Sequence, residues 1–318
     1  MRCRKCGETA VINMRHHKLA LCDEHFVTWF MQQTERTVEH HQMFARDDRI
    51  LVAVSGGKDS LSLWDVLLHL GYQADGLYIG LGIDGGFGYS ALSRQKVEAF
   101  VAQRPQARLI ISDVREAHGH SIPELALAKR RLDKPCSVCG LVKRHTMNRV
   151  ALEGGYNVLA TGHNLDDEAA VLMQNVLRWQ TGYLARQHPV LDEETGFARK
   201  VKPFCRFYER EVAAYALVRG VDYIYEECPH ATGAKTILYK ELLNRLEDAS
   251  PGAKHAFFLE FLRAKKQGKI VLQEDEEQRQ MHPCLYCGQP TTAPGICAFC
   301  RLWEGLAEPE RTPLPGPA

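Results

Sequence analysis

Eleven cysteines stand out in this chain of 318 residues, and ten of them fall into three groups. Near the amino end, Cys3 and Cys6 form a CxxC pair, and Cys22 with His25 forms a CxxH pair. Two such pairs supply the four ligands of a closed tetrahedral zinc site. A segment this short contains too little apolar material to fold without such a cross-link. We therefore expect a zinc finger over residues 1–28.

A second group of cysteines lies near the carboxyl end. Cys284 and Cys287 form one CxxC pair, and Cys297 and Cys300 form another after a spacer of nine residues. Four thiolates at this spacing are typical of structural zinc. The sequence therefore predicts a zinc ribbon over residues 273–305.

The middle group differs because it has three members. Cys136 and Cys139 form a CxxC pair, and Cys228 follows some ninety residues later. Three thiolates are one short of a closed structural site. Two interpretations remain open: an iron-sulfur cluster with one iron accessible to substrate, or redox-active thiols that carry sulfur as a persulfide. Either one predicts chemistry at these residues.

The segment between the zinc modules, residues 29–272, alternates apolar strand-like runs with helical patterns. Strands are expected in four segments that begin or end at polar motifs: 49–54, 74–83, 107–114 and 156–161. Helices are expected after each strand, over 60–71, 90–104, 137–155 and 165–179. This alternation predicts an α/β domain with an open parallel sheet and helices on both faces. Ligands in such folds bind outside the carboxyl ends of the strands.

SGGKDS, residues 55–60, follows the first of these strands and opens a helix. Gly56 and Gly57 permit close approach of the backbone, the helix terminus presents free amides, and Lys58 adds a positive charge. The motif is shorter than the GxxxxGK[ST] P-loop. A capped strand-to-helix turn is the simpler alternative. The order of strand, loop and helix favours a cradle for phosphates.

SGGKDS resembles the signature of the PP-loop ATP pyrophosphatases, which have an adenine nucleotide alpha hydrolase-like fold and activate a carbonyl oxygen by adenylation. CSVCGLVKR, ATGHNLDDEA, VKPF and EECP, framed by two zinc modules, are similar to the tRNA 2-thiouridine synthetases of this group. The likeness extends from Cys3 to about Trp303. The CxxH pair of Cys22 and His25 resembles the corresponding pair in one branch of this family, the enzymes that thiolate 5-methyluridine at position 54 of the tRNA T-loop. The anticodon-directed sister branch usually has cysteine at that ligand position, and the 2-thiocytidine branch lacks the zinc ends.

The resemblance implies a set of ATP-binding residues. Phosphates would lie on the loop, and backbone groups on three strand ends would bracket the adenosine. The residues are Ser55, Gly56, Gly57, Lys58, Asp59 and Ser60 for the phosphates, and Ala53, Ile79 and Gly162 for the adenosine. At Gly80 the family often has an acidic residue, which puts any metal or ribose contact there in doubt.

The resemblance also implies catalytic residues and cofactors. Lys143 and Asp167 match the family's catalytic lysine and aspartate, and Asp167 could hold Mg²⁺ or orient that lysine. Lys143 could instead be a solvated helix residue. Asp167 could serve only to offset the dipole of its helix, without a catalytic role. The family carries a [4Fe-4S] cluster on cysteines that match Cys136, Cys139 and Cys228. The persulfide route stays open.

Three further expectations concern partners. The resemblance implies tRNA as substrate, a ubiquitin-like thiocarboxylated sulfur carrier as donor, and a homodimer. Forty basic and 39 acidic residues give a net charge of +1, which excludes a globally basic nucleic-acid coat. Three local basic groups nevertheless favour phosphate contacts: Lys129, Arg130, Arg131 and Lys134; Arg199, Lys200, Lys202, Arg206 and Arg210; and Arg263, Lys265, Lys266 and Lys269. The lack of a signal peptide and of a membrane span predicts a cytoplasmic protein.

The leading hypothesis is an ATP-dependent tRNA thiolation enzyme that makes 5-methyl-2-thiouridine. Anticodon wobble uridine thiolation, an amidating PP-loop ligase and a non-catalytic zinc and iron-sulfur RNA-binding module are the alternatives. The three middle cysteines argue against the amidating ligase, and SGGKDS with Lys143 and Asp167 argues against the RNA-binding module.

The remaining residues of interest have structural interpretations, without a role in chemistry. Cys205 lacks a partner motif and is expected to be buried as a small hydrophobe. His163 is interpreted as a pocket wall or a helix cap. QEDEEQ, residues 273–278, is expected to be a solvated linker, and the last residues, 306–318, a disordered tail. Four histidines without metal-ligand spacing are expected at the surface: His16, His17, His40 and His41. His282 lies beside a CxxC pair and is also expected at the surface, because four thiolates already fill that site.

Overall fold

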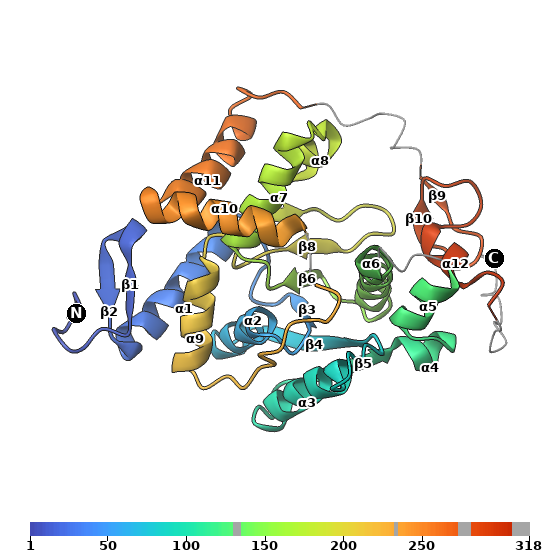
Figure 1. The fold of residues 1–318 in the computed structure, drawn as a ribbon, viewed down its shortest axis with the longest axis horizontal. Helices are drawn as coiled ribbons and strands as arrows, with labels where there is room; N and C mark the ends of the chain where they lie inside the picture. Colours follow the sequence, from blue (N-terminus) through green and yellow to red (C-terminus); the bar gives the residue numbers. More distant parts are fainter. Residues whose placement is uncertain (130–134, 232–234, 273–280, 307–318) are drawn as a thin grey trace.

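The computed structural model describes residues 1–129, 135–231, 235–272 and 281–306 (Figure 1). Its largest sheet has six strands in the order β5-β4-β3-β6-β8-β7. These strands are β3 (Arg49–Val54), β4 (Gln73–Gly80), β5 (Leu109–Asp113), β6 (Val158–Thr161), β7 (Val190–Leu191) and β8 (Arg199–Val201). All neighbouring pairs are parallel except β7 and β8. The predicted open parallel sheet is therefore confirmed, and the short antiparallel edge strand is an addition to it.

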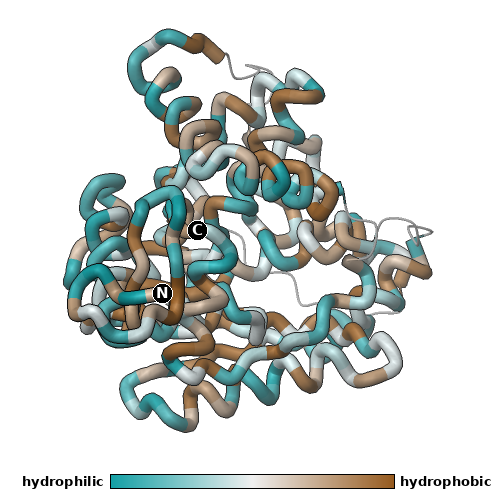
Figure 2. Tube along the Cα trace, turned by 60° about the vertical axis from the view of Figure 1, so that its left-hand side comes forward, coloured by the Kyte–Doolittle hydropathy of each residue, from teal (hydrophilic) through white to brown (hydrophobic). Residues whose placement is uncertain are grey.

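The helices of the sheet domain follow the strands and cover both faces of the sheet. They are α1 (Asp23–His40), α2 (Lys58–His69), α3 (Tyr89–Ala102), α4 (Val114–His118), α5 (Ile122–Ala128), α6 (Pro135–Glu153), α7 (Leu165–Leu177), α8 (Thr181–Arg186), α9 (Glu209–Val218), α10 (Lys235–Ala249) and α11 (Ala253–Lys266). In Figure 2 hydrophobic and hydrophilic residues alternate along the outer helices, as expected where one helix face is buried.

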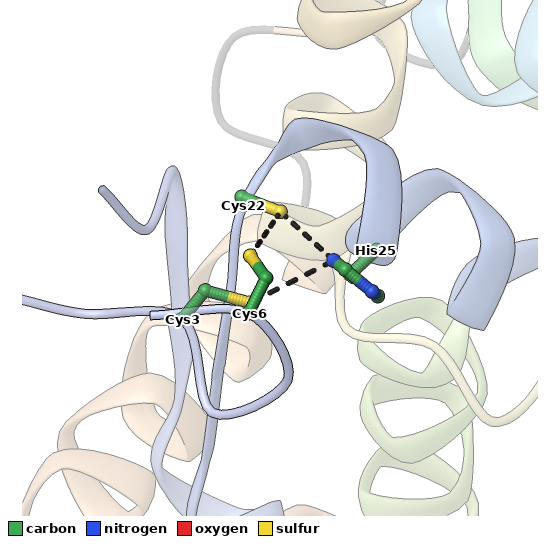
Figure 3. Close-up of side chains that lie close together, drawn as sticks. All are labelled: Cys3, Cys6, Cys22 and His25. Atoms are coloured by element: carbon green, nitrogen blue, oxygen red, sulfur yellow. Dashed lines mark hydrogen bonds between the residues drawn. The ribbon is translucent and has the colours of Figure 1, made fainter. Parts of the chain in front are cut away.

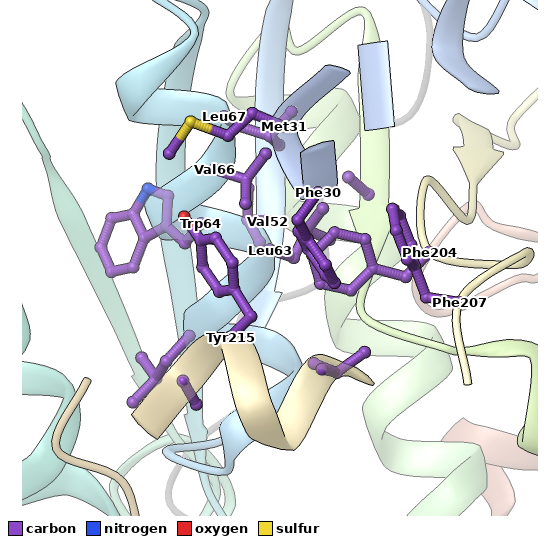
Figure 4. Close-up of a cluster of buried hydrophobic side chains, with 14 of the residues drawn as sticks. Phe30, Met31, Val52, Leu63, Trp64, Val66, Leu67, Phe204, Phe207 and Tyr215 are labelled. Carbon is purple, nitrogen blue, oxygen red and sulfur yellow. The ribbon is translucent and has the colours of Figure 1, made fainter. Parts of the chain in front are cut away.

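Strand β3 shows why the sheet needs helices on both sides. Successive side chains of a strand point to opposite faces. Ile50, Val52 and Val54 belong to a large hydrophobic core, whereas Leu51 belongs to a separate core on the other face. The large core contains aromatic rings from α1, α9 and the preceding loop, with Phe30 stacked on Tyr215 at 4.5 Å between ring centroids (Figure 4). The sequence of a strand that is buried on both faces is a nearly continuous apolar run, and the sequence of β3 has this form.

The carboxyl ends of β3, β4 and β6 meet at one edge of the sheet. Ala53 of β3 pairs with Leu77 of β4 and with Thr161 of β6. The chain adds β4 and β5 on one side of β3 and then returns to place β6 on the other side. This reversal creates a crevice between β3 and β6, where ligands of open α/β sheets bind.

Helix α9 is held against α2 by one buried carboxylate. Asp65 accepts hydrogen bonds from Arg104, Arg219 and Tyr215, with the shortest at 2.7 Å. Burial alone would raise the pKa of Asp65, but the hydrogen bonds from the two arginines and the tyrosine lower this pKa below its usual value. The fixed position of α9 places its first residue, Glu209, beside the SGGKDS loop.

Two small modules flank the sheet domain. The N-terminal one is a hairpin of β1 (Ile12–Met14) and β2 (Leu19–Leu21), joined by the 3-10 helix η1 (Arg15–His17). The C-terminal one contains β9 (His282–Pro283), β10 (Pro290–Thr291) and α12 (Ala298–Trp303). Among the described residues, no helix is long and apolar enough to cross a membrane.

Several single-residue predictions are tested by burial. Cys205 is fully buried and His282 is exposed, as predicted. Burial raises the pKa of Cys205 to about 12, so this thiol is protonated and inert. The linker, residues 273–278, and nearly all of the tail, residues 307–318, lie outside the described residues.

Candidate active site and metal centres

The SGGKDS loop joins β3 to the first turn of α2. Ser60 Oγ accepts a hydrogen bond from the amide of Ser55 at 3.1 Å and donates one to the carbonyl of Gly57 at 3.1 Å. Gly56 has φ +79°, and a Cβ there would lie 2.5 Å from the carbonyl oxygen of Ser93. Only glycine fits this close, left-handed position. The loop therefore leaves the amides at the α2 terminus open toward the sheet edge, as a phosphate cradle requires.

A cavity of 460 Å³ lies at the carboxyl ends of β3, β4 and β6. Its wall combines polar loop residues with apolar side chains such as Leu77, Leu81 and Met147. Nine of the predicted site residues line this single cavity: Ala53, Ser55, Gly57, Asp59, Ser60, Ile79, Lys143, Gly162 and Asp167. Sites far apart in the sequence thus converge on one cavity that has both apolar and polar walls.

Two glycines at the carboxyl ends of β4 and β6 contribute backbone only. A Cβ at Gly162 would lie 2.8 Å from the carbonyl oxygen of Asp59, so this position admits no side chain. A Cβ at Gly80 would collide with the carboxylate of Asp113, which pairs with Gly80 from β5. The carboxylate of Asp113, on the neighbouring strand, therefore occupies the space beside Gly80.

Lys58 and Asp167, two predicted residues, belong to a charge network that also includes Glu209 and Lys240. Lys58 Nζ lies 3.0 Å from Asp59 and 2.8 Å from Glu209. Lys240 Nζ lies 2.6 Å from Asp167 and 3.1 Å from Glu209. Burial alone would raise the pKa of Glu209, but the positive charges of Lys240 and Lys58 hold this pKa at about 2. Glu209 is therefore a permanent anion that links α9 and α10 to the loop.

Glu209 and Lys240 were not predicted from the sequence. They come from α9 and α10, and no motif there sets them apart from ordinary surface charges. Asp167 also completes the capping box of α7, whose N-cap is Asn164: Asp167 Oδ2 accepts a hydrogen bond from the amide of Asn164 at 3.0 Å. His163 lines the cavity, in keeping with its interpretation as a pocket wall, and lies 2.8 Å from the Thr161 hydroxyl.

Two of the middle cysteines, Cys136 and Cys139, lie in the first turns of α6, and Cys228 lies between α9 and α10. Cys139 and Lys143 are one helical turn apart and therefore share a face of α6. Cys136 Sγ donates to the carbonyl of His230, two residues beyond Cys228. Burial raises the pKa of Cys139, Lys143 opposes this rise, and the sulfurs of Cys228 and Cys136 add to it. Cys136, Cys139 and Cys228 thus lie in one neighbourhood, but unlike the two terminal sets they are not among the described groups whose ligand atoms all lie within 4.8 Å of one another.

The N-terminal ligand set converges in the structure (Figure 3). Potential ligand atoms of Cys3, Cys6, Cys22 and His25 all lie within 4.8 Å of one another. Cys6 and Cys22 have sulfurs 3.6 Å apart, and Cys22 Sγ lies 3.1 Å from Nδ1 of His25. Two thiolates bound at about 2.3 Å to one tetrahedral ion lie about 3.8 Å apart. The group is therefore shaped to bind a metal ion.

The C-terminal set converges in the same way. Cys284 and Cys300 have sulfurs 3.8 Å apart, and Cys287 and Cys297 also have sulfurs 3.8 Å apart. A residue outside the ribbon supports it: His145 of α6 stacks on Phe299 with ring centroids 3.5 Å apart, and its Nε2 lies 3.4 Å from Cys287 Sγ. His145 thus connects the ribbon to the helix that carries Cys139 and Lys143.

The surface prediction for His16 is wrong. Its side chain is 3% exposed and lies 3.1 Å from the carboxylate of Glu211. Together with His17 and His255 it forms a third group of metal-ligating side chains. Desolvation and the neighbouring His16 lower the pKa of His17 and of His255 to about 4, so both are neutral at pH 7. The prediction failed because His255 is 239 residues away from His16 in the sequence.

The other two histidines of that prediction differ from each other. His40 is exposed, as expected. His41 is half-buried, and burial lowers its pKa to about 4, with the neighbouring His40 adding to the effect.

Some of the basic residues that were expected to contact phosphates have structural partners instead. Lys202 forms an ion pair with the buried Glu168 at 2.8 Å. Lys265 donates to the carbonyl of Ala185 at 2.6 Å, at the end of α8. In the first basic group, residues 130–134 lie outside the described residues.

Replacing Gly56 by alanine is expected to weaken ATP binding about tenfold or more. The left-handed backbone costs alanine roughly 1–2 kcal/mol, and the methyl group would push the loop away from Ser93. Gly71→Ala is the matched control, because Gly71 also has a positive φ (+80°) but lies beyond the other end of α2, with nothing within 4 Å of an added Cβ. Equilibrium binding of ATP to both variants measures the difference. Equal affinity in the two variants would contradict this description of the loop.

The chain matches two protein families. Residues 2–27 match the N-terminal LIM domain of 2-thiouridine synthetase TtuA, and residues 30–233 match the PP-loop domain. A solved structure of the U34-tRNA thiolase NcsA from Methanococcus maripaludis with its [4Fe-4S] cluster has the same fold. It superimposes with a TM-score of 0.78 at 23% identity and covers 99% of each chain.

Curated relatives match along nearly the whole length. The tRNA-5-methyluridine(54) 2-sulfurtransferase of Thermus thermophilus is 50% identical over 306 residues, which is 96% of this chain and 92% of the relative. The protein of the same name from Pyrococcus horikoshii is 42% identical, covering 95% and 94%. With the cavity and both metal-ligating modules in place, the chain belongs to the PP-loop tRNA sulfurtransferases, in the TtuA-type family of tRNA-5-methyluridine(54) 2-sulfurtransferases.

Proposed function

We propose that this protein replaces the C2 oxygen of 5-methyluridine 54 in tRNA with sulfur, at the expense of ATP, to give 5-methyl-2-thiouridine. One observation carries the proposal. The predicted ATP loop, Lys143 and Asp167 line the same cavity, and Cys139 lies one helical turn from Lys143. A nucleotide and a sulfur-handling group can therefore meet at one substrate atom. Because the substrate is tRNA, we place the protein in the cytoplasm.

ATP fits this cavity in one orientation. The amides at the start of α2 suit the phosphates, while backbone at Ala53, Ile79 and Gly162 borders the apolar part that suits the adenosine. Lys58 lines a second cavity, where its ammonium pairs with Asp59 and Glu209. Burial raises the pKa of Asp59, and Asp167 and Glu209 add to this rise while Lys58 opposes it. A Mg²⁺ ion carried by the phosphates would offset this repulsion, so we assign Asp59 and Asp167 to its neighbourhood.

The first chemical step is adenylation. The C2 oxygen of the pyrimidine attacks the α-phosphorus of ATP, a bond to AMP forms, and pyrophosphate leaves. Negative charge increases on the phosphoryl oxygens in the transition state, where a nearby cation stabilises it. Lys143 lines the cavity and supplies that cation. Because Lys143 lies on α6 one helical turn from Cys139, it is also close to the site of the second step.

In the second step a sulfur nucleophile attacks C2, and AMP leaves with the original oxygen. Cys136, Cys139 and Cys228 suit a [4Fe-4S] cluster because three thiolates leave one iron open. Cys139 and Cys228 are half-buried at the edge of an apolar cluster, which limits solvent access to such a group. The cluster would supply an iron that binds the incoming sulfide. The three cysteines would hold it in place, and Lys143 would hold the adenylated base beside it.

Zinc is the proposed ion of both terminal modules, because each offers four soft or borderline ligands at tetrahedral separations. The sulfur donor is proposed to be a ubiquitin-like protein with a C-terminal thiocarboxylate, and the active form a homodimer. Both follow from family resemblance.

Mapping the sulfur in the product tests the proposal. The anaerobically prepared, cluster-loaded protein is incubated with ATP, a sulfide source and a tRNA that contains 5-methyluridine at position 54 and an unmodified wobble uridine. Sulfur is expected at position 54 alone, by mass spectrometry of the digested tRNA. Sulfur at the wobble uridine would assign the chain to the anticodon reaction instead. Tight binding of tRNA without any sulfur incorporation would favour a non-catalytic RNA-binding module.

A further inference from the structure

Three histidines meet where the N-terminal hairpin contacts α11, as a ligand group separate from the two cysteine-containing ligand sets. His16 and His17 end the 3-10 helix η1, and His255 lies in the first turn of α11. One ring nitrogen from each lies within 4.8 Å of the other two. The ring centroids of His16 and His17 are 4.1 Å apart, and those of His16 and His255 are 5.3 Å apart. These residues play no part in the thiolation site described above.

The partners of His255 favour metal binding over mere packing. Its Nε2 lies 2.8 Å from the backbone carbonyl of Arg206, to which it donates, and this leaves the lone pair on Nδ1. A ring nitrogen fixed by a backbone carbonyl while the other stays available is the usual arrangement of a metal-bound histidine.

His16 has an analogous neighbour. Its Nε2 lies 3.1 Å from Oε1 of Glu211, a residue with no exposed surface. The two atoms are not aligned as a hydrogen bond, and both are buried without another partner. Such unsatisfied polar atoms are costly in a protein interior. A cation bound at Nδ1 would place the proton on Nε2 and turn it toward the carboxylate, which satisfies both atoms.

We propose that His16, His17 and His255 bind one divalent transition-metal ion of the zinc class, a third metal site in addition to the two cysteine modules. Three neutral imidazoles are a common ligand set for zinc and leave a fourth position for water. Nitrogens bound at about 2.0–2.1 Å in a tetrahedron lie about 3.4 Å apart. Binding therefore needs the rings to move inward, which the exposed His17 can do by rotating its side chain.

The site would fasten the N-terminal module to the catalytic domain. His16 also lines a cavity of 490 Å³ whose wall includes Lys58 and Glu209 of the ATP-loop charge network. An ion on the three histidines would cross-link η1 to α11 at the rim of this cavity. Because an ion that binds only the folded state stabilises it, the protein should unfold at a higher temperature when the site is filled.

Zinc counting tests the site. The full chain without a polyhistidine tag, in a Cys136→Ala, Cys139→Ala background that removes competing thiolates, is dialysed against micromolar free Zn²⁺ and analysed by elemental mass spectrometry. We expect three zinc ions per chain, and two in His17→Ala. His255→Gln, which keeps a donor toward Arg206, should also bind two. His282→Ala, an exposed histidine elsewhere, should bind three.

The unfolding temperature gives a second readout. Added Zn²⁺ should raise it in the His282→Ala control and leave it unchanged in His17→Ala, whose side chain is exposed and whose fold is not at risk. Two zinc ions in the parent chain, or three in both His17→Ala and His255→Gln, would overturn the proposal. The histidines would then form an aromatic cluster only.

Discussion

Replacing Lys143 by methionine is expected to lower the rate of tRNA thiolation about 10²–10³-fold while ATP binding changes little. The methylene chain that packs against the cavity is kept, and only the cation near the reacting phosphate is lost. Removing one group that stabilises transition-state charge typically costs this much. Single-turnover thiolation with saturating ATP measures the effect.

The control for this prediction is Lys143→Arg. It keeps the charge and should recover a large part of the rate, whereas a residue that merely supports the fold would gain nothing from the charge. An unchanged rate in Lys143→Met would show that Lys143 is a solvated helix residue, the simpler interpretation of this position.

Replacing Cys139 by serine is expected to abolish cluster binding and to reduce thiolation at least about 100-fold. Mutating a residue that only hydrogen-bonds to a metal ligand already costs up to about 100-fold in metal affinity or activity, so losing a ligand should cost at least as much. Cys139 is half-buried and lies one helical turn before Lys143. ATP affinity should stay near that of the parent chain, because the SGGKDS loop is on another element. Iron and sulfide content, thiolation rate and ATP affinity are measured on one anaerobic preparation.

Cys205→Ala provides the matched control. Cys205 is fully buried and protonated, so its replacement should leave iron content and thiolation unchanged. A Cys139→Ser protein with full activity and no iron would eliminate the cluster from the mechanism. A protein that loses activity but keeps its iron would favour a persulfide on Cys139.

The parts that were predictable from sequence are those encoded locally. Each zinc ligand set consists of pairs spaced by two residues, so short segments identify it, and the structure brings each set together. The same holds for the SGGKDS loop, whose strand, glycines and helix are consecutive. Strand β3 was recognisable because a strand buried on both faces is continuously apolar.

Long-range arrangements could not be predicted in this way. Glu209 and Lys240 reach the ATP loop only because α9 and α10 fold back over it. His145 supports the ribbon from the middle of α6. His16 was predicted to be at the surface because its neighbours in space, Glu211 and His255, are distant in sequence. Strand β7 has two residues, too few for a period-two pattern.

The central claim is that ATP activates the C2 oxygen of 5-methyluridine, and the fate of that oxygen tests it most directly. A tRNA is prepared with a heavy oxygen isotope at C2 of residue 54 and is thiolated by the cluster-loaded protein, and the nucleotide product is analysed by mass spectrometry. We predict AMP whose phosphoryl group carries the heavy isotope, in an amount equal to the sulfur incorporated. Unlabelled AMP, or ADP in its place, would contradict adenylation of the base.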